Sequence, residues 1–153
     1  MGMSGKRRHL YSDDRGTAAV EFAIIGTLLT FLMLGAVDFG IGYWQYIQVG
    51  NAARAGAEYA ANNGWNQTAI QGAVTSATAL GSVAATPAPT EFCGCPDASS
   101  GITSKTCGAH CTHGGTAGTY VTVNAQATYA TMFHVPGVPT SFPLSASNTV
   151  RIN

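Results

Sequence analysis

A long uncharged stretch near the N-terminus limits what this chain can fold into. From Phe22 to Val37 no residue carries a charge, and the apolar segment as a whole runs from Ala18 to about Gly40. About 20 apolar residues in a helix cross the hydrocarbon core of a bilayer, so residues 18–40 are long enough for a single membrane span. We therefore predict a membrane-anchored protein rather than an ordinary water-soluble one.

The basic residues predict the orientation of this segment. The chain has 7 lysines and arginines and 7 aspartates and glutamates, which gives no strongly charged surface to bind nucleic acid or to steer a charged small-molecule substrate. Four basic residues precede the segment, namely Lys6, Arg7, Arg8 and Arg15. Because positive charge is retained on the cytoplasmic side, we predict a cytoplasmic N-terminus and an extracytoplasmic body. Tyr43, Trp44 and Tyr46 suit the outer aromatic belt, which favours a retained anchor over a cleaved signal peptide.

The helical pattern continues beyond the membrane segment. Small or apolar residues recur at helical spacing on one side, namely at Val49, Ala53, Gly56 and Ala60. Asn62, Asn63 and Gly64 then form a stop signal. We therefore predict one helix over residues 17–62, with its membrane span at about 18–40. The glycines inside it each cost about 1 kcal/mol against alanine, which predicts a kink or local melting.

The remainder of the chain predicts a small α+β body. Asn66 is a suitable N-cap for a short helix that ends near Leu80. Alternation predicts a strand with an inward face of Val121, Val123, Ala125, Ala127 and Tyr129. A second strand has the inward residues Leu144, Ala146, Val150 and Ile152, with Asn148 as a polar exception. We expect these strands to form a small antiparallel sheet against the outer half of the long helix.

Four cysteines lie in the part assigned to the far side of the membrane, namely Cys93, Cys95, Cys107 and Cys111. That compartment is oxidising in a bacterium, which predicts two disulfides. A bridge between Cys93 and Cys95 would be strained, because positions i and i+2 of a strand lie near the upper limit for a bridge. We therefore expect this pair to join Cys107 and Cys111 and to staple the loop 93–111. Closing a loop of about 15 residues contributes roughly 3 kcal/mol on the chain-entropy model.

A zinc or thiol-redox site is the alternative for these cysteines, with His110 and His113 close by. Structural zinc sites prefer cysteine pairs two to four residues apart, and Cys93 and Cys95 are closer than that. A redox dithiol needs an exposed thiolate of low pKa. The chain has no phosphate-binding loop, His-Glu-x-x-His helix or nucleophile elbow. We predict a protein that is not an enzyme and holds no cofactor.

Glu21 stands at the mouth of the apolar segment, five positions after Gly16. A carboxylate near the bilayer costs roughly 2–3 kcal/mol or more, and such a residue often has a function. The simpler interpretation is that Glu21 lies just outside the membrane at headgroup level. Position alone does not separate these two interpretations.

Two segments resemble the TadE-like pseudopilins of Tad/Flp pilus systems. The stretch Gly16-Thr17-Ala18-Ala19-Val20-Glu21-Phe22 is similar to the Gly-x-x-x-x-Glu-Phe processing site of such prepilins. The stretch Asn51-Ala52-Ala53-Arg54-Ala55-Gly56-Ala57-Glu58-Tyr59-Ala60 is similar to the Asn-Ala-Ala-Arg-x-Gly-Ala-x-Tyr-Ala segment of TadE-like proteins. Residues 121–123 and 144–151 are also similar to the terminal strands of that family. Residues 65–118 match only in having a Cys-Gly-Cys-Pro cluster.

The resemblance implies a processed structural protein. A prepilin peptidase would cut on the cytoplasmic side between Gly16 and Thr17, ahead of Glu21 and Phe22. Glu21 would then meet the cationic N-terminal amine of a neighbouring helix or of its own. The implied partners are the peptidase, other Tad pseudopilins and, as a further candidate, the major Flp pilin. Ala36 and Gly40 form a small-residue pair at the end of the span, where a second helix can approach closely. Together with residues of the TadE-like stretch, the expected helix-packing and interaction residues are Ala36, Gly40, Asn51, Ala53, Arg54, Gly56 and Tyr59.

We therefore predict a minor pseudopilin of an adhesive Flp-type (type IVb) pilus, in the bacterial inner membrane. Its segments are a cytoplasmic leader at 1–16, the long helix at 17–62 and a periplasmic pilin-like domain at 63–153. Incorporation into the filament itself is left open. The competing hypotheses are a membrane-anchored extracytoplasmic redox or metal-binding protein that uses the four cysteines, and an uncleaved signal anchor that carries a binding domain.

Overall fold

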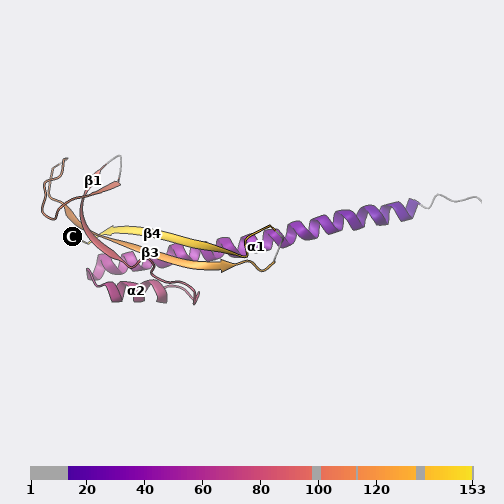
Figure 1. Ribbon diagram of the computed structural model, residues 1–153, viewed down its shortest axis with the longest axis horizontal. Coiled ribbons are helices and arrows are strands. Elements are labelled where there is room, and N and C mark those ends of the chain that lie inside the picture. Colours follow the sequence, from indigo (N-terminus) through magenta and orange to yellow (C-terminus); the bar gives the residue numbers. More distant parts are fainter. Residues whose placement is uncertain (1–13, 98–100, 113, 134–136, 153) are drawn as a thin grey trace, which may run out of the picture. The chain divides into compact units, whose positions relative to one another are not determined.

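The computed structural model describes residues 14–97, 101–112, 114–133 and 137–152 (Figure 1). In chain order its elements are α1 (Asp14–Asn63), α2 (Gln67–Ser76), β1 (Thr90–Asp97), β2 (Gly101–Ser104), β3 (Gly118–Ala130) and β4 (Ser141–Arg151). A long apolar helix and a short helix precede a curled, four-stranded antiparallel sheet, so the predicted α+β class is confirmed. The chain divides into two compact units, residues 1–37 and residues 38–153.

The described part of the first unit is the N-terminal half of α1, residues 14–37. Its large apolar side chains are exposed, and Phe22 and Leu28 have 77% and 60% of their surface accessible. Leaving so much apolar surface in water is unfavourable by about 25 cal/mol per Å². The described residues contain one helix, α1, that is long and apolar enough to cross a membrane.

The ends of α1 lie close to the predicted ones. The helix begins at Asp14, slightly before the predicted Thr17, and ends at Asn63. Gly64 follows with a φ of 79°, and its N–H donates to the carbonyl of Ala60 at 2.9 Å, which is a common way to end a helix. The internal glycines predicted a kink or local melting, and of these two local melting does not occur, since α1 is helical from Asp14 to Asn63.

The second unit has one hydrophobic core, which lies between α1, α2 and the sheet. Figure 1 shows α2 alongside the C-terminal part of α1. The buried residues of the core are Val49, Ala52, Ala53, Ala57, Ala60, Ile70, Val74, Val83, Val121, Val123, Ala125 and Ala127. The predicted inward face of β3 is therefore confirmed, and its last member, Tyr129, is buried as well.

Gly56 is a point of close approach in this core. A Cβ atom there would lie 2.5 Å from Cγ2 of Val74 on α2 and 2.8 Å from Cγ1 of Val123 on β3. Real Cβ atoms do not approach other atoms so closely, so a larger residue would force the side chains of Val74 and Val123, or the elements that carry them, to move. The small-residue stripe of α1 is thus the face that packs inside its own domain.

The sheet has the strand order β2-β1-β3-β4, and its pairs are antiparallel. β1 and β2 lie mostly in the region that the sequence predicted only as the stapled loop 93–111. Period-2 alternation was absent there because Cys93, Gly94 and Cys95 are all buried on β1. On the same side of β3, Ala84 bridges Gln126 through N–H···O bonds of 2.9 and 2.8 Å.

The short helix α2 begins where the sequence predicted. The side chain of Asn66 accepts the N–H of Ala69 at 3.1 Å, so the N-cap is confirmed. The helix ends at Ser76 rather than near Leu80. Thr78 explains this difference, because its hydroxyl accepts the N–H of Leu80 at 3.1 Å and replaces the helical bond.

Candidate functional site

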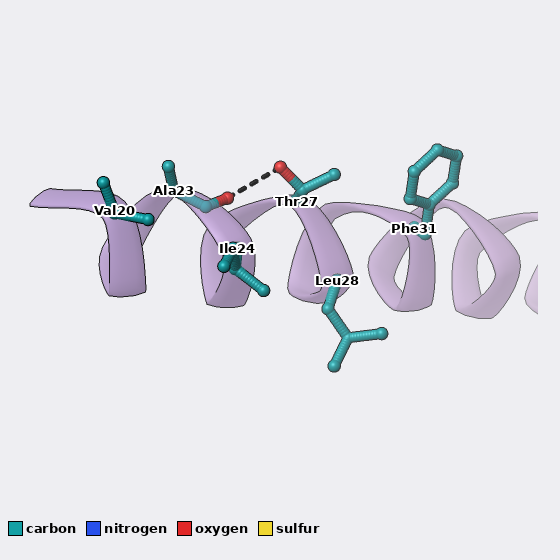
Figure 2. A pocket seen from close by; sticks show the side chains of 6 residues that line it. All are labelled: Val20, Ala23, Ile24, Thr27, Leu28 and Phe31. Carbon is teal, nitrogen blue, oxygen red and sulfur yellow. Dashed lines mark hydrogen bonds between the residues drawn. The ribbon is translucent and has the colours of Figure 1, made fainter.

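The N-terminal half of α1 presents a shallow apolar strip, shown in Figure 2. The strip is open to its surroundings and is formed by Val20, Ala23, Ile24, Thr27, Leu28 and Phe31. These residues are three and four positions apart, which places them along one side of the helix. The hydroxyl of Thr27 donates to the carbonyl of Ala23 at 2.7 Å, so it adds no unsatisfied donor to apolar surroundings.

The residues expected at a processing site lie at the start of this half. Gly16 and Thr17 lie near the start of α1, which spans Asp14–Asn63. The side chains of Glu21 and Phe22 are exposed. Glu21 has no hydrogen bond or ion pair with a described residue. A carboxylate in this position therefore needs water, a lipid headgroup or a positive charge from outside the described residues.

Asp38 fastens α1 to the end of β3. Its carboxylate accepts the hydroxyl of Tyr129 and the backbone N–H of Met132, the latter at 3.0 Å. The Tyr129 hydroxyl also lies 2.9 Å from the backbone carbonyl of Asp38. One turn further along α1, a Cβ at Gly42 would lie 3.1 Å from the Tyr129 ring. We call Asp38, Gly42, Tyr129 and Met132 the Asp38 clasp.

The clasp changes the chemistry of Tyr129. The hydrogen bond to Asp38, helped by burial and by the negative charge of that carboxylate, raises the pKa of Tyr129 to about 12. Hydrogen bonds to a charged group are roughly twice as strong as neutral ones. The clasp begins within residues 18–40, so contacts with the sheet start inside the interval predicted for the membrane span. Its geometry can position a domain on a helix, and it contains no nucleophile–base pair.

The residues predicted for helix packing and interaction have two different environments. Three lie in the core or pack against it, namely Ala53, Gly56 and Tyr59. Four are exposed, namely Ala36, Gly40, Asn51 and Arg54. The structure therefore brings the first three together inside one domain, and it leaves the other four accessible to further molecules.

Asn51 and Arg54 line a groove between α1 and β4. The groove has a volume of about 460 Å³, and its lining residues are Tyr46, Ile47, Gly50, Asn51, Arg54, Ala146, Ser147, Asn148 and Thr149. Asn148 was the polar exception in the inward pattern of the last strand. It lies at this open groove rather than in the closed core, which explains why a polar residue is tolerated there.

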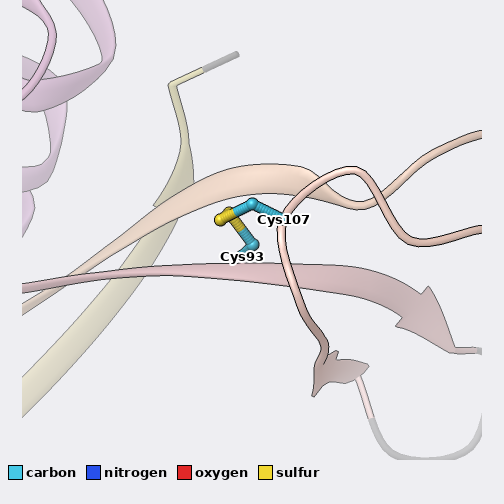
Figure 3. Close-up of a disulfide and its surroundings, with 2 residues drawn as sticks. All are labelled: Cys93 and Cys107. Atoms are coloured by element: carbon cyan, nitrogen blue, oxygen red, sulfur yellow. A yellow bond between two sulfur atoms is a disulfide. The ribbon is translucent and has the colours of Figure 1, made fainter.

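Two disulfides hold the cysteine loop to the sheet. Cys93 bonds to Cys107, as Figure 3 shows, and Cys95 bonds to Cys111. The Cα–Cα distances are 5.1 and 5.6 Å, which are ordinary for bridged cysteines. Both bonds join the first pair to the second pair, as expected. Gly94 lies between the bridges, where a Cβ would lie 2.7 Å from Cγ2 of Ile102.

The metal or redox alternative gains no support from this geometry. The cysteines of the described segments are all in disulfides, so none offers a thiolate as ligand or nucleophile. Within those segments no group of three or more His, Cys, Asp and Glu residues is placed to hold a metal ion. His110 is exposed, and His113 lies outside the described residues.

Comparison with known protein families finds a match that lies within α1. A family model described as TadE-like protein matches residues 16–58. The predicted resemblance to the TadE-like family is thereby confirmed for this interval. No curated protein and no solved structure matches the chain.

The TadE-like interval contains Glu21, Asp38 and Arg54, and it ends before α2 and the sheet. Of these residues, sequence reasoning assigned no role to Asp38. Three sequence features could have indicated the clasp. They are the lone carboxylate of Asp38 at the end of the apolar segment, Gly42 one turn later, and Tyr129 at the end of a predicted strand. The disulfides and the β4 side of the groove lie outside the matched interval.

Proposed function

We propose that this TadE-like chain is a minor pseudopilin that helps to assemble an adhesive Flp-type pilus at the bacterial inner membrane. The observation that carries this proposal is the TadE-like match over residues 16–58. It falls on a helix whose N-terminal half exposes a continuous apolar surface. The proposed role is structural, because the clasp and the disulfides join parts of the fold and the apolar half of α1 offers a surface for other membrane helices.

A prepilin peptidase would cut this chain between Gly16 and Thr17. Supporting this, Gly16 lies near the start of α1, and a Cβ there would meet no atom of the described residues within 4 Å. A glycine also allows a protease to approach the backbone closely. Removal of residues 1–16 would create a cationic amine at Thr17, close in sequence to the exposed Glu21.

The partners would be the peptidase, other Tad pseudopilins and, as a further candidate, the major Flp pilin. The apolar strip from Val20 to Phe31 supplies a surface for a neighbouring membrane helix, because side chains at this spacing interdigitate with those of a second helix. Glu21 would take its counter-charge from the new N-terminal amine of a neighbour or of its own chain. The sheet domain favours a tip or membrane position over the shaft of a thin filament.

The processing step is tested with Gly16→Leu. We expect this variant to keep residues 1–16, because a bulky side chain blocks the peptidase. Gly26→Leu is the matched control, since Gly26 is another open glycine of the same half of α1. The measurement is the N-terminal sequence of each purified protein. A wild-type chain that still begins at Met1 when the peptidase is present would contradict the proposal.

The role of Glu21 is tested separately. Glu21→Ala should be processed at a near-normal rate and yet associate poorly with its pilin-like partners, because the cationic amine loses its counter-charge. Co-purification of partners with wild type, Glu21→Ala and Glu21→Gln measures this effect. If Glu21 only marks the membrane edge, all three proteins will recover their partners equally.

A further inference from the structure

Among the described strands β4 is the last of the sheet, so one of its sides forms a long edge. Its partner is β3, and the N–H of Ile152 donates to the carbonyl of Thr119 at 3.0 Å. Backbone hydrogen bonding alternates along an antiparallel pair, so even-numbered residues of β4 bond to β3. The N–H and C=O groups of Ser145, Ser147 and Thr149 therefore point to the open side. Pro143 agrees with this phase, since its missing N–H would also point outward.

The two edges of the sheet differ in how they are protected. β2, at the other edge, spans Gly101–Ser104 and is too short to template a long partner. β4 spans Ser141–Arg151, and residues 144–150 contain no charged side chain that would repel an added strand. Long unprotected edges are sites for pairing with another chain. The β4 edge is therefore the side of this sheet that is open to strand addition.

The groove beside this edge has a definite chemistry. On the α1 side, Ile47 and Tyr46 expose apolar surface, and Arg54 brings a positive charge. Arg54 has no ion pair with a described residue, including Glu58 one turn later. Asn148 adds a polar group from β4. An added strand would thus place apolar side chains and one carboxylate against α1.

We propose that the β4 edge and the Arg54 groove together bind an extended segment of another protein that carries one carboxylate. The segment would add a fifth strand beside β4, with main-chain bonds to Ser145, Ser147 and Thr149 and its carboxylate on Arg54. Side-chain contacts in the groove select the segment, and the main-chain bonds hold it.

The shared membrane makes a second copy of this chain a poor occupant, an argument that rests on the proposed function. α1 runs parallel to β4, because Asp38 contacts the end of β3 at Tyr129 and later residues of α1 line the groove with residues 146–149. A two-fold pairing of β4 with itself is antiparallel, so the two Asp38 residues would lie at opposite ends of the joined sheet. Both chains enter their sheet domains at Asp38, and both anchors must reach one membrane.

The test uses the full chain in detergent and two fluorescent, end-capped eight-residue peptides. Both peptides contain threonine, serine and valine; one has a central glutamate and the other has glutamine there. Fluorescence anisotropy should show that the glutamate peptide binds at least about tenfold more tightly, as a charge-assisted bond predicts. Arg54→Gln should abolish this preference.

Ser147→Pro should abolish binding of both peptides, because it removes an outward N–H and leaves the β3–β4 bonds in place. Ser147→Ala keeps that N–H and should bind like wild type. Equal affinity of wild type for the two peptides, or binding of neither, would overturn the proposal. A detergent-solubilised dimer that becomes monomeric on Ser147→Pro would also overturn it, because a second copy would then occupy the edge. Peptide binding does not depend on cleavage at Gly16, so failure here is distinct from failure of the proposed function.

Discussion

The two halves of α1 share one backbone conformation and differ in what surrounds their side chains. Residues 14–37 carry large apolar side chains that the described structure leaves exposed. Residues 38–63 carry many small side chains, and those on one face are buried under β3 and α2. A helix for lipid needs bulk to fill apolar surroundings, whereas a helix that supports a sheet needs small residues for close approach. The difference teaches that the side chains of one continuous helix can suit an apolar environment in its first half and close packing under a sheet in its second half.

The largest expected effect is a loss of stability that is confined to the sheet domain (residues 38–153) and leaves the N-terminal half of α1 unchanged. Replacing both Cys93 and Cys107 with serine should lower the free energy of unfolding of the domain by roughly 2–5 kcal/mol. The anchor half contains no cysteine, so membrane retention should not change. Thermal unfolding followed by circular dichroism, together with carbonate extraction of membranes, measures the two outcomes. Loss of membrane retention in the double variant would break the comparison.

A matched pair of charge insertions compares the surroundings of the two halves directly. Leu28→Lys should disfavour membrane insertion by about 3 kcal/mol, because a lysine near the bilayer centre is costly. Ile47→Lys should change stability by at most about 0.5 kcal/mol, since Ile47 is 43% exposed on the water-facing domain. The inserted fraction of each variant in isolated membranes is the measurement. Equal insertion of both variants would show that the halves share one environment.

Substitutions at two glycines test the close packing of the C-terminal half of α1, residues 38–63. Gly56→Ala should destabilise the domain by about 1–3 kcal/mol, because the new methyl group would overlap Val74 and Val123. Gly50→Ala is the control, since a Cβ there meets nothing within 4 Å and alanine is favoured in a helix by about 1 kcal/mol. Urea unfolding of the two variants measures whether each substitution lowers or raises the free energy of unfolding. A stabilising Gly56→Ala would contradict the packing described for the core.

The smallest effect concerns the Asp38 clasp. Tyr129→Phe should lower stability by about 1 kcal/mol at neutral pH, because it removes a donor from the Asp38 carboxylate. Tyr43→Phe should have little effect, since Tyr43 is exposed.

The clasp also predicts an alkaline pH dependence. The pKa of Tyr129 is raised from 10.0 to about 12 in the folded chain, so its contribution to stability is complete below pH 10 and is lost as the pH rises through 12. Unfolding midpoints across this range should fall less steeply for Tyr129→Phe than for wild type. Parallel pH profiles would show that the clasp does not form.

The sequence predicted the helix and the strand whose residue pattern reflects a single environment along the whole element. α1 and β3 follow from apolar length, helical spacing and alternation, each with one dominant environment. β1 and β2 were missed, since Cys93, Gly94 and Cys95 are buried together by the disulfides and by contact with Ile102. Such burial depends on residues distant in the sequence.

The candidate sites were predictable to different degrees. The four cysteines and the exposed pair Asn51 and Arg54 were visible in the sequence. The clasp was not, because the partners of Asp38 are Tyr129 and Met132, which are more than 90 residues away in the sequence. Asn148 was noticed as an exception, and only the position of β4 at the edge of the sheet explains it.

The central claim is that α1 lies in lipid over its first half and in the periplasm over its second. Labelling of Leu28→Cys and Ile47→Cys with a membrane-impermeant maleimide tests it in spheroplasts. The native cysteines are in disulfides, so the wild type serves as an unlabelled control. We predict that Ile47→Cys reacts in intact spheroplasts and that Leu28→Cys stays unlabelled even after lysis. Equal labelling of both positions, or labelling of Ile47→Cys only after lysis, would contradict the account.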